Sequence, residues 1–120
     1  MRHTLTVGLV ASLVCCAFLA SSTGHAEADP KIARTWKAKC SSCHGVDGKA
    51  GTDTGAKLKI PDMTTAAWQK GITDVQMKKS IAEGVKPRNG NTEGMDGFAE
   101  KGLTPEQIDG LVAVVRGLGK

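Results

Sequence analysis

The sequence has 120 residues and a formal net charge of +4, with 15 glycines, two tryptophans, two phenylalanines and no tyrosine. A chain of this length forms one small domain, and its composition excludes a multidomain enzyme, a coiled coil and a membrane bundle. Four cysteines are also too few for a disulfide-dense scaffold. Buried aromatic side chains each contribute about 150–250 Å² to a core, so a chain this poor in them leaves its centre to be filled by something else.

The N-terminus has the pattern of a cleaved export signal. A positively charged start precedes an apolar core over 7–20, and small residues then lead to the motif Ala-x-Ala that ends at Ala28. The apolar core has 14 residues, fewer than the ~20 that a membrane-spanning helix needs. We therefore expect residues 1–28 to be a secretory signal peptide, cleaved after Ala28 or Ala26. Residues 29–120 would then form one exported domain, periplasmic in a Gram-negative cell.

The first predicted helix of this domain lies directly after the signal. Asp29 followed by Pro30 is typical of an N-cap and a first helical position. Ile32, Trp36 and Cys40 then recur on one face of a helix.

Further along the chain, short helices are predicted over 65–70, 73–84 and 104–118. The last two each begin with a threonine and have a glutamine three residues later, which is the pattern of a capping box. No stretch alternates apolar and polar residues for long enough to predict a strand. The glycine-rich connections 45–58 and 85–102 are long, which is typical of loops that carry function or contact a bound group. The sequence predicts an all-α fold of three or four helices with loops wrapped around such a group.

Cys40, Cys43 and His44 form the Cys-x-x-Cys-His motif of covalent c-type haem attachment. On a continuous helix these side chains stand at i, i+3 and i+4 and therefore point the same way. Two thiols can then bond two vinyl groups at the porphyrin edge while the imidazole reaches the iron from one side. The other two cysteines, Cys15 and Cys16, fall in the expected signal peptide. We therefore expect one haem c per chain, bound through Cys40 and Cys43.

Three other uses of the cysteine pair are less favoured. A redox-active disulfide requires a βαβ setting, which the sequence does not show. A zinc site requires four ligands, and only three are available, all from one turn. A structural disulfide between Cys40 and Cys43 would close almost no loop.

The sixth iron ligand has three candidates, because no second histidine follows residue 28 and Met63, Met77 and Met95 remain. Met77 lies on a predicted helical face, where a methionine usually fills the core. Met63 stands between polar residues and fits either role. Met95 lies in a glycine-rich loop before the last helix, and that loop can bring it to the face opposite His44. We favour Met95.

At this point the chain resembles a known family. The segment 36–45 is similar to the haem-binding segment of small bacterial class I cytochromes c. The segments that follow in that family's order are Pro61-Asp62-Met63-Thr64, Ile81-Ala82-Glu83-Gly84, Met95-Asp96-Gly97-Phe98 and Leu103-Thr104-Pro105-Glu106-Gln107-Ile108. The resemblance covers residues 31–118. It implies the family's all-α fold, one covalently held haem, and axial coordination of the iron by His44 and Met95.

The chain also departs from the family's pattern. Asp96 follows Met95 where family members commonly have proline, and the loop 85–94 is longer than usual. The family often packs a glycine of the first helix against an aromatic residue of the last, and the matching positions here are Ile32 and Val114.

Three further roles follow from the resemblance. Trp36 is expected to pack on the proximal side of the haem. Trp68 fits either the core or a hydrogen bond to a haem propionate. Pro61 or Ala56 takes the place of the proline that supports the proximal histidine.

The basic residues are unevenly distributed along the chain. Residues 31–88 contain 12 basic and 5 acidic side chains, whereas residues 89–120 contain 3 and 5. These charges are either an ordinary solvated surface or a basic surface that steers an acidic redox partner toward the haem segment. Nucleic-acid binding is disfavoured, because there is no basic helix and no set of stacking aromatics.

The function predicted from these observations is that of a soluble, exported electron carrier. We expect a monomer that passes single electrons between redox partner proteins and catalyses no reaction of its own. The alternative is a haem-based sensor of small ligands or a weak peroxidase, in which Met95 is a labile ligand.

Overall fold

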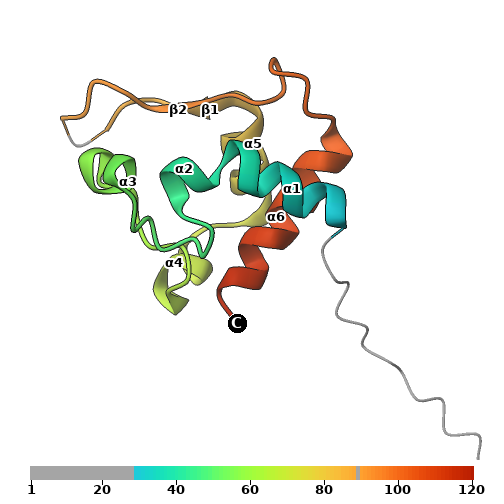
Figure 1. Cartoon of the computed structure of the whole chain (residues 1–120), viewed down its shortest axis with the longest axis horizontal. Coiled ribbons are helices and arrows are strands. Elements are labelled where there is room, and N and C mark those ends of the chain that lie inside the picture. The colour runs from blue at the N-terminus through green and yellow to red at the C-terminus, as the bar shows by residue number, and fades with distance from the viewer. Residues whose placement is uncertain (1–28, 89) are drawn as a thin grey trace, which may run out of the picture.

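The computed structural model describes residues 29–88 and 90–120 (Figure 1). The predicted signal peptide, residues 1–28, lies outside the described residues. The elements in chain order are α1 (Pro30–Lys39), α2 (Ser41–His44), α3 (Asp53–Leu58), α4 (Ala66–Gly71), α5 (Asp74–Glu83), β1 (Gly84–Val85), β2 (Met95–Asp96) and α6 (Pro105–Leu118). The predicted all-α class is confirmed, because each strand has only two residues.

The four helices that the sequence predicts, α1, α4, α5 and α6, begin at the expected residues. Asp29 caps α1, and its Oδ1 accepts a hydrogen bond of 2.8 Å from the backbone N–H of Lys31. Both predicted capping boxes are present, one at the start of α5 and one at the start of α6. Each such cap stabilises its helix by about 1 kcal/mol, so local sequence alone defines these starts.

The core lies where α1, α5 and α6 meet (Figure 1). The apolar stripe of α6 is its largest contributor, and Leu111 at its middle is 1% exposed. The other buried members are Ile32, Trp36, Met63, Met77, Leu103, Ile108, Val112 and Val115. Trp36 is the one buried aromatic side chain among the described residues, as the composition led us to expect.

The close contact between the first and last helices uses a residue that the sequence did not suggest. Gly110 of α6 faces Ile32 of α1, and a Cβ added at Gly110 would lie 2.8 Å from Cγ1 of Ile32. The expected partner Val114 is half-buried at the edge of the same core. The small residue of this contact is therefore on α6 and the large one on α1, the reverse of the family's common arrangement of a glycine on the first helix and an aromatic residue on the last.

Three elements were not predicted. Helix α3 lies in the segment expected to be a loop. It was not predicted because it has only six residues and contains a glycine. The strands β1 and β2 pair antiparallel, with Gly84 opposite Asp96 and Val85 opposite Met95. Two residues per strand are too few for an alternating pattern, so the sequence could not reveal them. Among the described residues, no helix is both long and apolar enough to cross a membrane.

A polar network fixes α4 to α6. The Arg116 guanidinium donates to the carbonyls of Gln69 and Ile72, the latter at 2.6 Å, and to the Asp74 carboxylate at 2.8 Å. The Gln69 side-chain amide donates in turn to the carbonyl of Met63 at 2.7 Å. The segment that carries Met63 is thereby held against the C-terminal half of α6.

Candidate haem-binding site

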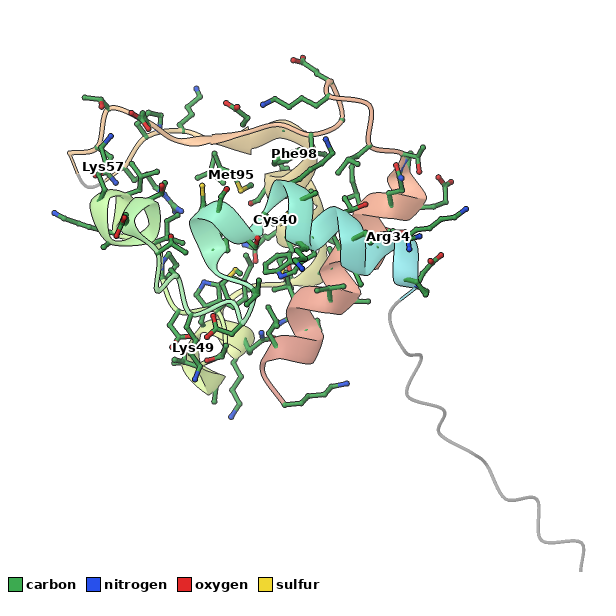
Figure 2. The ribbon with its side chains drawn as sticks, viewed as in Figure 1. Arg34, Cys40, Lys49, Lys57, Met95 and Phe98 are labelled. Atoms are coloured by element: carbon green, nitrogen blue, oxygen red, sulfur yellow. The ribbon has the colours of Figure 1, made fainter. Side chains whose placement is uncertain are left out.

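A cavity of about 730 Å³ opens between the helical core and the β1–β2 hairpin. This is within the range of about 300–1,000 Å³ that is usual for enclosed ligand sites. Its walls come from every part of the described chain: the end of α1 and α2, the segment 58–63, α5, β2 and α6. Figure 2 shows Cys40 at the end of α1, with Met95 and Phe98 between that helix and the hairpin.

Cys40 and Cys43 both line the cavity and are free thiols. Helix α1 ends at Lys39, so the predicted continuous helix is interrupted at Cys40. A short helix, α2, follows, and the N–H of His44 donates to the carbonyl of Cys40 at 3.0 Å. The break leaves Cys40, Cys43 and His44 on the wall of one cavity, as the motif predicts.

The environment of Cys40 does not suit thiol redox chemistry. Burial, followed by the neighbouring Cys43, raises the pKa of the Cys40 thiol to about 11. Redox-active cysteines have a lowered pKa, because the thiolate is the reactive form. A protonated, half-buried thiol beside a large cavity therefore argues against the redox-disulfide alternative. Among the described residues no cluster of potential metal ligands exists that would serve the zinc alternative.

The His44 imidazole is suited to binding a metal centre from the side of α2. Burial lowers its pKa, so the ring is neutral at neutral pH, which is the form that ligates metals. Its Nδ1 is buried and has no hydrogen-bond partner among the described residues. Neither Pro61 nor Ala56, the two candidates for the position that supports the proximal histidine, is bonded to it. Its ring lies 6.1 Å from that of Trp36, measured between centroids, and the Trp36 indole donates to the carbonyl of Val46 at 3.1 Å.

Helix α3 buttresses the haem-binding segment from behind. The Thr52 hydroxyl donates to the carbonyl of Cys43 at 3.0 Å and accepts from the N–H of Gly55 at 2.9 Å. A Cβ added at Gly55 would lie 2.8 Å from the oxygen of Cys43 and would overlap the oxygen of Ala50. Only glycine permits this approach, so the sequence of α3 is shaped by its contact with α2.

The three candidate methionines all line the cavity, but their surroundings differ. Met63 and Met77 are 5% and 3% exposed and belong to the core cluster. Met95 is half-buried, and its backbone is held in β2 by pairing with Val85. It comes from the hairpin, whereas His44 comes from α2, so the two residues reach the cavity from different walls.

The residues around Met95 form a second local arrangement. Lys101 pairs with the Asp96 carboxylate at 2.6 Å and lies 5.6 Å from the centroid of the Phe98 ring. All three line the cavity beside Met95. Asp96, which stands where the family commonly has proline, is therefore engaged in an ion pair.

Several residues in or behind the cavity wall were not predicted from the sequence. Thr52, Gly55 and Asn91 stand in predicted loops, and their roles depend on contacts with distant segments. Trp68 packs against the core cluster and also lines the cavity; its hydrogen bond to a haem propionate stays a prediction.

The cavity fits the group that its residues suggest. Two free thiols, one neutral imidazole and a thioether lie around a space lined mainly by apolar side chains, and the buried Nδ1 of His44 is left without a partner. Softer sulfur and imidazole ligands of this kind suit haem iron.

Comparisons with known proteins agree with this geometry. The family model described as "Cytochrome C oxidase, cbb3-type, subunit III" matches residues 27–114. Among solved structures, the KustC0563 c-type cytochrome is 39% identical, with a TM-score of 0.63, over 73% of this chain and 96% of that chain. A tyrosine-to-phenylalanine mutant of Kustc0563 is 37% identical, with a TM-score of 0.59, over 72% and 96%. Among curated proteins, none matches the chain.

The fold and the site define a small cytochrome c of the class I type. Because the matched region 27–114 covers most of the chain, the protein belongs to the family described as cytochrome c oxidase, cbb3-type, subunit III. The resemblance found in the sequence is thereby confirmed. A c-type cytochrome domain implies covalently bound haem c and, in general, electron transfer rather than catalysis.

Proposed function

We propose that this protein carries single electrons through one haem c, bound covalently by Cys40 and Cys43 and ligated by His44 and Met95. The observation that supports the proposal best is that these four side chains line a single cavity of about 730 Å³. Two of its walls, α2 and the hairpin, contribute one candidate axial ligand each.

Each side chain has a separate role in this proposal. Haem c, when bound, supplies a one-electron iron(III)/iron(II) couple. The imidazole of His44 offers a neutral nitrogen to the iron, and burial keeps it neutral. The thioether of Met95 favours the reduced iron and so raises the potential relative to harder ligands. Met63, Met77 and Leu111 exclude water from the inner part of the cavity.

The rim of the cavity supports a docking role toward acidic redox partners. Lys39, Lys59, Lys86 and Arg88 line it and have no ion-pair partner among the described residues. Positive charge of this kind steers an oppositely charged partner toward the site and makes association sensitive to salt. The proposal also includes export to the periplasm and a monomeric carrier that is not itself an enzyme.

A spectroscopic experiment tests the function. The haem-loaded protein would be reduced and then challenged with carbon monoxide, which binds iron(II) only where an axial position is open. A low-spin c-type spectrum that carbon monoxide leaves unchanged is expected for the electron carrier. A spectrum that shifts with carbon monoxide would instead support the sensor or peroxidase, and absence of a haem band would exclude both.

Two variants test the ligand assignment. Met95→Ala is expected to open the iron to carbon monoxide. Met63→Ala is expected to leave the spectrum insensitive to carbon monoxide and to reduce stability, because Met63 is buried in the core. The reverse result would move the ligand from Met95 to Met63.

A further inference from the structure

Asn91 makes a long-range contact across the mouth of the cavity. Its side-chain Nδ2 donates a hydrogen bond of 2.6 Å to the backbone carbonyl of Leu58, at the end of α3. Asn91 is half-buried, whereas the flanking residues Gly90 and Thr92 are exposed. Its side chain is therefore turned inward from an otherwise exposed segment, toward an element 33 residues earlier in the chain.

The acceptor of this bond belongs to the buttress of the haem-binding segment. Leu58 is the last residue of α3, and the first turn of α3 is bonded to the carbonyl of Cys43 through Thr52. Gly55, between them, packs against the same carbonyl. The position of the Leu58 carbonyl thus follows the position of Cys43 and His44.

The donor of the bond lies four residues before Met95. Met95 is held on one side by its pairing with Val85 of β1, the strand that follows α5 directly. Close backbone approach reinforces this pairing, because a Cβ at Gly94 would overlap the carbonyl oxygen of Val85. The Asn91 bond adds a second anchor, on the side of the hairpin that faces α3.

We propose that Asn91 is a positioning residue for Met95. By bonding to Leu58, Asn91 ties the hairpin that carries Met95 to the helix that buttresses His44. The bond thereby sets the separation of the two walls of the cavity that carry His44 and Met95. This inference rests on the proposed function, in which Met95 and His44 ligate the same iron.

The neighbouring ion pair offers an internal comparison. Lys57 and Glu93 join the same two segments at 3.3 Å, but both side chains are mostly exposed. Exposed ion pairs contribute little, whereas a half-buried hydrogen bond of 2.6 Å is geometrically specific. The Asn91 bond is therefore the contact that positions the hairpin, and the ion pair is secondary.

The test measures the carbon monoxide affinity of the reduced, haem-loaded protein. Removing the Asn91 bond should raise the fraction of molecules in which Met95 has left the iron, and apparent affinity rises with that fraction. For Asn91→Ala we expect an increase of about fivefold, the size that follows from the loss of one ordinary hydrogen bond. Asn91→Asp keeps the shape but removes the donor, so it should give at least the same increase. Thr92→Ala and Glu93→Gln are matched controls in the same loop and should change the affinity less than about twofold.

A double variant distinguishes a positioning role of Asn91 from a general loss of stability. In a Met95→Ala background the iron is already open, so adding Asn91→Ala should leave the carbon monoxide affinity unchanged. An increase of similar size in both backgrounds would overturn the inference, as would unchanged affinity in both Asn91→Ala and Asn91→Asp.

Carbon monoxide binding by Met95→Ala alone shows whether the proposed function itself fails. If Met95→Ala itself leaves the iron closed to carbon monoxide, then Met95 is not the ligand and both proposals fall. If Met95→Ala opens the iron and the Asn91 variants do not, only the positioning role of Asn91 is overturned.

Discussion

Ile32 on α1 lies directly against Gly110 on α6, so close that a Cβ at Gly110 would come within 2.8 Å of Cγ1 and 3.1 Å of Cδ1 of Ile32. The branched Ile32 side chain is 8% exposed and has little freedom to move aside. The first and the last helix therefore cross with a glycine at the contact.

Gly110→Ala should destabilise the protein by about 1–3 kcal/mol, the usual cost of overpacking a core. Gly117→Ala is the matched control on the same helix, because nothing lies within 4 Å of its added Cβ. It should raise the free energy of unfolding by up to about 1 kcal/mol through helix propensity. Denaturant unfolding measures both, and equal effects of the two variants would contradict the close contact.

Covalent attachment should depend on the two cysteines separately. Cys40→Ala and Cys43→Ala should each retain haem through one thioether bond, and the double variant should lose all covalent haem. Haem staining after denaturing electrophoresis measures this directly. Ser42→Ala is the control, because Ser42 is exposed at a variable position of the motif and supplies no thiol, although its hydroxyl lies 3.9 Å from Sγ of Cys43. Haem that stays attached in the double variant would refute the role of the pair.

The turn before α4 should make stability depend on pH. The hydroxyl and then the backbone N–H of Thr64 donate to Asp62 Oδ1, at 2.6 and 2.8 Å, and these bonds lower the Asp62 pKa below its ordinary value of 3.8. A carboxylate with a lowered folded pKa stabilises the fold above its unfolded pKa, and the contribution is lost as pH falls through the folded value.

Thr64→Val removes the hydroxyl donor and tests this dependence. The difference in stability between the natural protein and this variant should be constant above about pH 5 and shrink as the pH falls below 3.8. Chemical unfolding across this range provides the measurement. Thr92→Val, at an exposed threonine, should show no such pH dependence. A difference for Thr64→Val that grows toward acid would contradict the assignment.

The basic rim of the cavity should control the rate of reaction with anions. The double variant Lys86→Glu/Arg88→Glu should slow oxidation of the reduced protein by ferricyanide by about three- to tenfold at low salt, and high salt should remove the difference. Lys70→Glu changes an exposed charge on α4 that does not line the cavity and should have little effect. Stopped-flow kinetics at several ionic strengths provide the measurement. Lys70→Glu changes the net charge by half as much as the double variant, so a logarithmic slowing half as large would mean that net charge matters and the rim does not.

Local signals in the sequence predicted much of the fold. Capping boxes at Thr73 and Thr104 and the Asp29-Pro30 start place three helices, because caps depend on residues only a few positions apart. The haem-binding motif likewise lies within five consecutive residues.

The features that the sequence could not predict depend on distant contacts. The Ile32–Gly110 contact joins the two ends of the domain, and the resemblance suggested Val114, not Gly110, as the partner of Ile32. The Asn91–Leu58 bond joins two segments that both look like loops. Neither contact produces a periodicity or a motif in the sequence, because each depends on how separate elements pack.

Both tryptophans of the sequence, Trp36 and Trp68, line the cavity. Haem absorbs in the region where indole emits, so in the loaded protein both would be quenched by energy transfer at short range. Emission would appear only when the cofactor is lost or when the walls separate, so the protein contains its own optical reporter of cavity integrity. With no tyrosine in the chain, no competing emission would obscure that signal.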